Sequence, residues 1–223
     1  MTLAPEEPKR GCLLCPRLAS YRAENQAKEA GWHNAPVPSF GALDARLLIV
    51  GLAPGRMGAN RTGRPFTGDH AGKLLYATLL KFGFARGEYA ERPDDGLTLV
   101  DCRITNAVRC APPGNRPTPS EIKACGGYLA SEVAAMPNLS GILALGQIAH
   151  NAVLTTFGLV RSRHPFAHGA LHDMGQGRTL ADSYHCSRLN TNTGRLTDAM
   201  FADVVRSLKE RIGGTHRQPG LRQ

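Results

Sequence analysis

Four short apolar runs alternate along this chain with stretches in which apolar residues recur at the spacing of a helix. This alternation decides the predicted fold class. Each run is rich in aliphatic residues, which is typical of a strand buried on both faces. The runs are Arg46–Gly51, Leu97–Val108, Gly141–Leu145 and Arg178–Ser183. Strands that alternate with helices favour a parallel sheet between helical layers, so an α/β protein is predicted.

The predicted helices follow the strands in the chain. They are Ala71–Phe82, a helix from Thr118 to about Met136, Gln147–Phe157 and a last helix that begins at Thr197. Thr118-Pro119-Ser120-Glu121 is a typical helix start, with a capping Thr and Glu three residues later. A length of 223 residues without internal repeats fits a single domain over residues 1–223. Residues 213–223 are expected to form a flexible basic tail.

The net positive charge of the chain indicates which classes of binding partner it favours. Lys and Arg total 27 against 18 Asp and Glu, which gives a formal net charge of +9 with neutral histidine. Such a surface favours anionic partners such as nucleic acid, acidic lipid or phosphorylated ligands, and solubility alone is the competing explanation.

The composition also bears on location. No apolar run approaches the ~20 residues that a membrane helix needs. The first residues, MTLAPEEPKRGC, lack the apolar core of a secretion signal. We therefore expect a soluble cytoplasmic protein.

The cysteines suggest a metal site. Cys12 and Cys15 are separated by two residues, while Cys110 follows an apolar strand and Cys125 lies on a predicted helix. Two close thiolates and two from another region can close a four-thiolate site, for which zinc and iron–sulfur both remain open. Redox thiols and disulfides are the alternatives, although nothing else suggests secretion.

The remaining cysteines are interpreted differently. Cys102 lies inside an apolar run and is expected to be a core thiol. Cys186 follows His185, but adjacent residues of an extended chain face opposite ways, so a Cys–His nucleophile pair is not favoured.

Three loops are predicted at the carboxyl ends of the strands, where parallel sheets bind ligands. They are Leu52–Asp69, Asn106–Gly114 and His185–Arg195. Glycines in the first loop would let its backbone approach a ligand closely. That loop is neither a Walker loop nor a dinucleotide fingerprint, because both glycine patterns are absent.

Individual side chains of these loops suggest base recognition. Phe66 can stack on a nucleobase or return to the core. The Asn106 amide offers a donor and an acceptor, which matches one edge of a pyrimidine. His185 can donate to an oxygen that gains charge, and Leu189 can act as a wedge between bases. Each has a commoner structural explanation when taken alone.

Taken together and in this order, the motifs resemble the family-5 (UDGb-type) uracil-DNA glycosylases, which are close to family 4. The resemblance covers nearly the whole chain. It rests on Gly51-Leu52-Ala53-Pro54, Gly58 through Arg64, Phe66-Thr67-Gly68-Asp69, Asn106, His185-x-Ser187-x-x-Asn190, Thr193 through Thr197, and four cysteines.

The resemblance implies a three-layer α/β/α sandwich around a four-stranded parallel sheet. It implies an enzyme that flips uracil out of DNA and hydrolyses the N-glycosidic bond. A 4Fe–4S cluster is implied on Cys12, Cys15, Cys110 and Cys125.

The resemblance also implies roles in the loops. Phe66 would stack on the base, and Asn106 would read its edge. His185 would stabilise negative charge at uracil O2, and Leu189 would fill the gap left in the duplex. The other implied substrate-binding residues are Gly51, Ala53, Ser187 and Asn190.

The first loop departs from related families. Family 1 has Asp shortly after the strand and family 4 has Glu in place of Leu52, whereas this region is apolar or small here. Asp69 becomes the candidate carboxylate, as in family 5, to stabilise a cationic sugar or to orient water. The alternative is a helix cap.

Three arginines are candidates for phosphate contacts that offset the cost of base flipping: Arg61, Arg64 and Arg188. For Arg61 and Arg64 the alternative is loop solvation or pairing with nearby acids.

The predicted partner is DNA that contains uracil or other deaminated bases such as hypoxanthine, because few base-reading groups are visible. We expect a monomer that associates with the nucleoid through DNA. The rival functions are a nucleotide hydrolase with a four-cysteine metal site, acting on free nucleotides, and a non-enzymatic iron–sulfur DNA-binding module.

Overall fold

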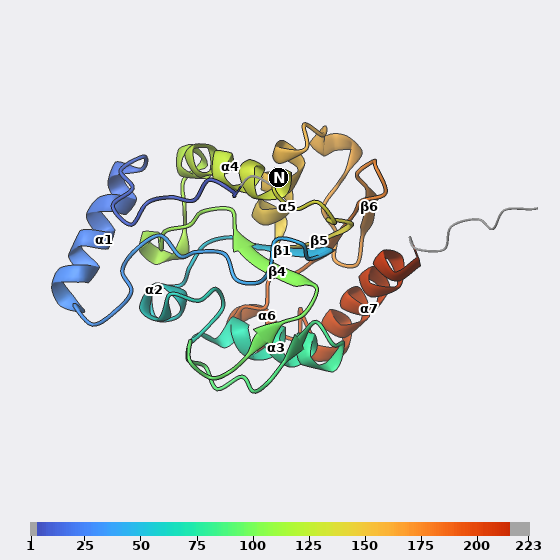
Figure 1. Cartoon of the computed structure of the whole chain (residues 1–223), viewed down its shortest axis with the longest axis horizontal. Coiled ribbons are helices and arrows are strands. Elements are labelled where there is room, and N and C mark those ends of the chain that lie inside the picture. Colours follow the sequence, from blue (N-terminus) through green and yellow to red (C-terminus); the bar gives the residue numbers. More distant parts are fainter. Residues whose placement is uncertain (1–3, 215–223) are drawn as a thin grey trace, which may run out of the picture.

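A mostly parallel sheet forms the centre of the protein, as seen in a computed structural model that describes residues 4–214 (Figure 1). Its strand order is β4 (Cys102–Asn106), β1 (Leu47–Gly51), β5 (Gly141–Leu145), β7 (Thr179–Ser183) and β6 (Leu171–Asp173). The first four strands are parallel, and β6 pairs antiparallel with β7 at the edge. The predicted α/β class and its four parallel strands are confirmed, and the short antiparallel strand β6 makes the sheet five-stranded where four strands were expected.

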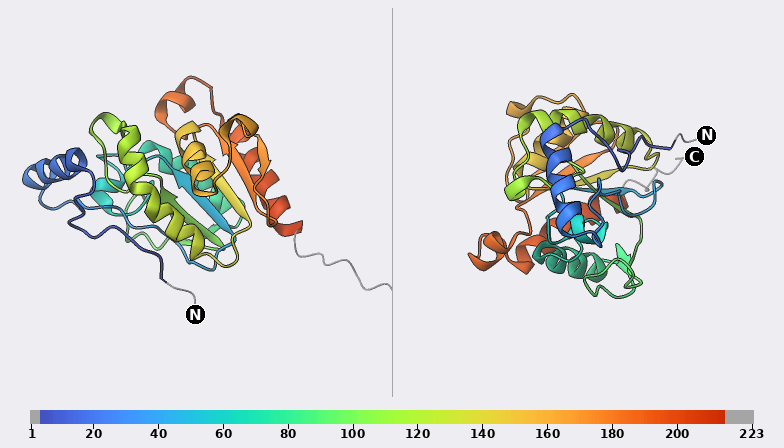
Figure 2. Two further views of the ribbon diagram at one scale, coloured as in Figure 1. Left: turned by 90° about the horizontal axis from the view of Figure 1, so that it is seen from above. Right: turned by 90° about the vertical axis from the view of Figure 1, so that its left-hand side faces the viewer.

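Helices cover both faces of this sheet. They are α1 (Pro16–Lys28), α2 (Ala59–Thr62), α3 (His70–Lys81), α4 (Pro119–Ala134), α5 (Gln147–Thr156), α6 (Arg188–Asn192) and α7 (Asp198–Gly214), with short 3-10 turns at Pro113–Asn115 and Arg161–Arg163. Figure 1 shows α4 and α5 above the sheet and α3 and α7 below it. Figure 2 shows α1 at one end of the molecule, away from the end of α7.

The alternation of side chains along β1 explains the three layers. Leu47 and Ile49 pack into the core shared with α3 and α7, whereas Leu48 and Val50 pack into the core shared with α4 and α5. All four side chains are almost completely buried, and burying such a side chain contributes about 1.5–3 kcal/mol. Strands β1 and β5 are therefore apolar throughout, because helices cover them on both sides.

The predicted strand Leu97–Val108 is wrong as one element. Residues Thr98–Leu99 form β3, which pairs with β2 (Ala85–Arg86) in a separate small sheet, and only β4 joins the main sheet. The chain breaks at Asp101, which has a φ of 51°. Its carboxylate accepts hydrogen bonds from the backbone N and Nε of Arg46, both at 2.7 Å, and these contacts fix the turn.

The two ends of the chain also differ from expectation. Helix α1 was not predicted; it begins at Pro16, and its buried residues are only Leu18 and Asn25. At the other end α7 continues to Gly214, so residues 213 and 214 of the predicted tail are helical. The rest of that predicted tail, 215–223, lies outside the described residues. Within the described part, no helix is long and apolar enough to cross a membrane.

Candidate functional site

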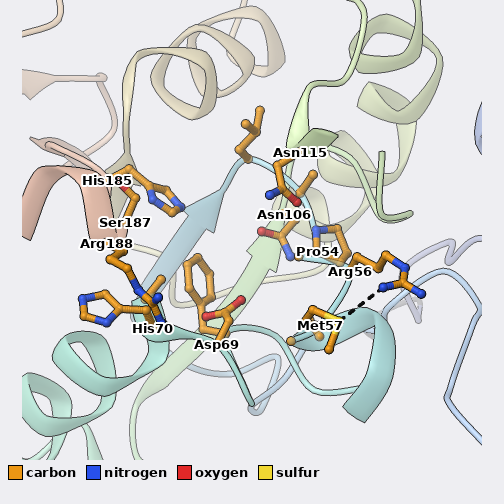
Figure 3. Close-up of a pocket in the computed structure, with 17 residues that line it drawn as sticks. Pro54, Arg56, Met57, Asp69, His70, Asn106, Asn115, His185, Ser187 and Arg188 are labelled. Atoms are coloured by element: carbon orange, nitrogen blue, oxygen red, sulfur yellow. Dashed lines mark hydrogen bonds between the residues drawn. The ribbon is translucent and has the colours of Figure 1, made fainter. Parts of the chain in front are cut away.

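A cleft of about 490 Å³ opens at the carboxyl ends of the parallel strands (Figure 3). It is built from the loops that follow β1, β4 and β7, as predicted for a parallel sheet. Seven of the predicted residues line it: Ala53, Phe66, Asp69, Asn106, His185, Ser187 and Arg188. The sequence therefore predicted the position of the cleft and much of its wall.

Asn106 supplies an acceptor without a partner. It is the last residue of β4, lies opposite Gly51 and is only 4% exposed. Its Oδ1 atom is buried and has no hydrogen-bond partner among the described residues. A Cβ on Gly51 would lie 2.4 Å from this oxygen, so glycine is what gives the amide its room. Such an orphaned buried acceptor is costly unless a ligand donates to it.

Phe66 is both a core residue and a wall of the cleft. Its ring is 6% exposed, and its centroid lies 6.1 Å from that of His185. The residue has a φ of 53°, which is unusual for a bulky side chain. Two tyrosine hydroxyls hold this turn through hydrogen bonds. The Tyr76 hydroxyl donates to the Pro65 carbonyl at 2.6 Å, and the Tyr89 hydroxyl donates to the Phe66 carbonyl at 3.0 Å. The ring is thus fixed against the cleft.

Asp69 caps α3 and faces the cleft at the same time. Its Oδ1 accepts from the backbone N–H of Gly72. A Cβ on Gly58 would lie 2.4 Å from Asp69 Oδ2, and one on Gly55 would lie 3.1 Å from it. The glycine-rich loop therefore wraps closely around this carboxylate. Burial raises the pKa of Asp69 above its ordinary value, because the charged form loses hydration.

His185 follows β7 and lies across the cleft from Asn106 (Figure 3). Burial lowers its pKa, so the ring is neutral at pH 7. Asn190 does not line this cleft; its Nδ2 donates to the His185 carbonyl at 2.8 Å and holds the turn. Ser187 accepts from the backbone N–H of Asn190 and caps α6. Leu189, on that short helix, is 73% exposed.

The cleft residues that were not predicted as site residues include Arg56, Met57, His70 and Asn115. Asn115 lies one residue beyond the predicted loop Asn106–Gly114 and has a φ of 56°, which Asn tolerates better than most residues. The sequence Pro-Pro-Gly-Asn is a turn signal that could have placed it. His70 Nε2 and Thr191 Oγ1 are hydrogen-bonded at 2.8 Å, so His70 links α3 to α6.

Arg64, predicted to contact DNA, has in this structure the surroundings that the sequence left open as the alternative, a pairing with a nearby acid. Its side chain is 6% exposed and forms a bidentate ion pair with the Asp95 carboxylate, in which both N–O distances are 2.8 Å. The guanidinium also lies over the rings of Phe40, Tyr76 and Tyr89. Arg64 therefore holds the loop in place, whereas Arg61 and Arg188 are exposed.

Replacing Arg64 with Met is expected to cost about 3–5 kcal/mol of stability, because it leaves the Asp95 carboxylate buried without its cation. Arg64 lowers the pKa of Asp95, so this stabilisation exists above the ordinary pKa of Asp and is lost as pH falls. Thermal melts should show a loss near pH 7 that begins to shrink only as the pH falls below ~4. Arg61→Met, in the same loop but exposed, is the control; equal losses for both variants would contradict the assignment.

The four predicted metal-binding cysteines lie close together, around a cavity separate from the cleft. Cys12, Cys15, Cys110 and Cys125 surround a small cavity that Leu18, Val108 and Tyr128 also line. All four are free thiols. Arg22 donates to Cys110 Sγ and the Arg109 backbone N–H donates to Cys125 Sγ, each at 3.4 Å. Donors aimed at sulfur are what bound thiolates require.

The spacing of these sulfurs bears on what they can hold. One tetrahedral zinc ion keeps its sulfurs about 3.8 Å apart. Among the described residues, no three of the four Sγ atoms lie within 4.8 Å of one another. Burial raises the pKa of Cys125 to about 11, so thiolates here need a cation. The four thiols are compatible with a bound metal cluster.

The two remaining cysteines are as predicted. Cys102 is 1% exposed and Cys186 is completely buried. Burial raises the pKa of both thiols, which makes them poor nucleophiles.

A base-sized cleft at the strand ends and a four-thiol site beside it agree with the comparison to known proteins. The family model of the uracil DNA glycosylase superfamily matches residues 38–209. The chain therefore belongs to the uracil-DNA glycosylase superfamily. The match leaves out Cys12 and Cys15, which lie before it.

Several curated relatives of this chain are type-5 uracil-DNA glycosylases. A type-5 uracil-DNA glycosylase of Thermus thermophilus is 46% identical over 207 residues, which are 91% of this chain and 94% of the relative. One from Mycobacterium bovis is 42% identical over 91% of this chain and 78% of its own length. One from Pyrobaculum aerophilum is 41% identical over 87% and 86%. The family-5 resemblance is confirmed.

Proposed function

We propose that this chain excises uracil from DNA by hydrolysing its N-glycosidic bond. The unpartnered, buried Oδ1 of Asn106 is the observation that carries the proposal. Uracil N3 carries a hydrogen, and its neighbouring carbonyl accepts one, so its edge complements an amide. Phe66 offers a ring on which a base that enters the cleft can stack.

The polar groups of the cleft suit the chemistry of bond cleavage. Departure of the base leaves negative charge on uracil and positive charge on the sugar. His185 is neutral and donates a hydrogen bond to the oxygen that gains charge. Asp69 stabilises the cationic sugar or orients the attacking water. The two groups act on opposite charges of one transition state, so neither has to be a strong base.

Extrusion of the base requires contacts with the duplex. Leu189 projects into solvent on α6 and would fill the gap in the base stack. Arg188, beside it at the cleft, and Arg61 are exposed and would contact phosphates. Base flipping costs a few kcal/mol, and such contacts offset it.

We also propose a broad base range. Asn106 is the only amide at the cleft end of a parallel strand in the described sheet, and part of the remaining wall comes from residues with small side chains or none, namely Ala53, Gly55, Gly58, Ala59 and Ala71. Hypoxanthine and other deaminated bases would therefore be accepted beside uracil.

A glycosylase assay tests the function directly. Duplexes that carry uracil, hypoxanthine or the normal bases are incubated with enzyme, and abasic sites are measured by strand cleavage in alkali. Free deoxyuridine monophosphate is the control substrate. Release of uracil from DNA is expected, and release from the free nucleotide alone would contradict the proposal.

We propose that the four thiols hold a 4Fe–4S cluster with a structural role. The cluster, when bound, supplies four strong bonds that join the N-terminal segment, the loop after β4 and α4. Its thiol cavity adjoins the cleft because Ala53 contacts both: it lines the cleft and packs against Val108 and Cys125.

Loss of one ligand should remove the iron and destabilise the fold. Cys125→Ala is expected to give colourless protein with a lowered thermal midpoint. Cys102→Ala, a buried thiol outside the set, should keep its iron and brown colour. Iron analysis and visible absorption make the measurement. Stoichiometric zinc in active, colourless wild-type protein would disprove the iron assignment.

A further inference from the structure

A second group of metal-binding side chains lies away from the cysteines, between α5 and the β6 edge of the sheet. It consists of His150 on α5, His172 on β6 and Asp182 on β7. Their potential ligand atoms all lie within 4.8 Å of one another. Nothing in the proposed glycosylase reaction uses these residues.

This cluster is buried, and its charge needs compensation. The Asp182 side chain is 0% exposed and that of His150 is 1% exposed. A buried carboxylate is strongly disfavoured unless a cation lies beside it. Among the described residues, the ion-pair partners of Asp182 are the two histidines alone, at 2.7 Å for His150 Nδ1 and 2.9 Å for His172 Nε2.

Counting hydrogens on His150 separates two explanations. Its Nε2 lies 2.9 Å from the His164 carbonyl, which only accepts, and its Nδ1 faces the Asp182 carboxylate, which also only accepts. Without a metal ion, a hydrogen must lie between His150 Nδ1 and Asp182 Oδ1, on either the ring or the carboxyl group. With a metal ion at Nδ1, the ring is neutral and needs only the hydrogen on Nε2.

The second arrangement is the one that metal sites use. A metal-binding histidine generally donates its other N–H to a carbonyl or carboxylate, which fixes the tautomer and the ring orientation. The His164 carbonyl has that place here. Ligand atoms of one zinc ion lie about 2.9–3.4 Å apart, so the observed separations need only a small opening.

We propose that His150 Nδ1, His172 Nε2 and the Asp182 carboxylate bind one divalent transition-metal ion of the zinc class. Two imidazoles and one carboxylate suit zinc, cobalt or nickel rather than magnesium or calcium. His172 is the most exposed of the three, with 10% of its side chain accessible, so the ion enters from the side of β6.

The expected role of this ion is structural. It would join three elements, among them β6, which has only three residues and pairs with β7 alone. Asp182 is also three residues before His185, so the ion would stiffen the strand that leads into the cleft. Its binding does not depend on the proposed glycosylase activity.

Zinc binding by the iron-loaded holoprotein tests the proposal. Purified protein is stripped of loosely bound ions, incubated with zinc chloride and passed through a desalting column, and zinc and iron are then measured together. One zinc per chain is expected, with unchanged iron and a raised thermal midpoint. Asp182→Asn and the more exposed His172→Gln should each lose that zinc while iron is retained, which reports a folded protein.

Asp173→Asn is the matched control, since Asp173 lies on the same strand β6 as His172 but is exposed, and its carboxylate accepts from the Gly175 N–H. It should bind zinc as wild type does. Absence of zinc uptake by wild type, or equal uptake by all variants, would overturn the proposal and leave a hydrogen-bonded network. Iron that falls as zinc rises would place the zinc at the cysteines and overturn it as well.

Discussion

Asp69→Asn should slow single-turnover cleavage of every accepted base by about 10²–10⁴-fold, the range that a positioned acid or base contributes. The substitution removes the negative charge that would support the cationic sugar. It keeps an oxygen that can accept from the Gly72 N–H, and Asn caps helices as well as Asp does. The thermal midpoint should therefore change little, although Asp69 is a cap.

The pH dependence of this rate gives a second readout. Burial raises the pKa of Asp69, so the carboxyl group becomes neutral at a higher pH than an exposed Asp would. As pH falls through that raised pKa, the rate of wild type should fall, and this acid limb should be absent in Asp69→Asn. Asp203→Asn, an exposed carboxylate on α7, is the control. A normal cleavage rate with lowered stability in Asp69→Asn would show that Asp69 acts only as a helix cap.

Asn106 should behave differently from Asp69. A carboxylate that acts on the sugar affects all bases alike, whereas an amide that reads one base edge does not. Changing Asn106 to Ala should therefore alter the rates for uracil and hypoxanthine by unequal factors. Comparing the two variants separates support of the sugar from recognition of the base.

The central strands could be predicted from the sequence because their apolar composition marks them directly. Continuous apolar runs such as Gly141–Leu145 can only be buried on both faces, and β5 has those bounds. Edge elements lack such a signal: β6 is three residues long and contains His172 and Asp173. Helix α1 is mostly exposed and polar, so no apolar stripe marked it.

The cleft could be predicted because parallel strands end at one edge, which brought Asn106, Asp69 and His185 together in space. The sequence could not show which arginine of one loop is buried. Arg61 and Arg64 are only three residues apart in the sequence, and only the fold brings Asp95 and three aromatic rings to Arg64. Long-range pairing of that kind has no local pattern. The same holds for the orphaned oxygen of Asn106, which depends on its partner across the sheet, Gly51.

His185→Ala should lower the single-turnover rate by about 10²–10³-fold and leave DNA binding nearly unchanged, since one donor to a developing oxyanion contributes that much. The ring is neutral at pH 7 because burial lowers its pKa, so it acts by donating a hydrogen bond and not by its charge. His185→Gln retains an N–H donor and should recover part of the rate.

The effect of His185 must be separated from loss of structure in the same turn. His168 accepts from the backbone N–H of Tyr184 and does not line the cleft, so His168→Ala is a control for damage to the segment before His185. If His168→Ala slows cleavage as much as His185→Ala, the histidine acts only by shaping the turn. If His168→Ala cleaves normally and His185→Gln is faster than His185→Ala, the hydrogen-bond donor of His185 is required. Glutamine keeps an N–H donor but differs from histidine in shape, so a partial recovery reports the donor.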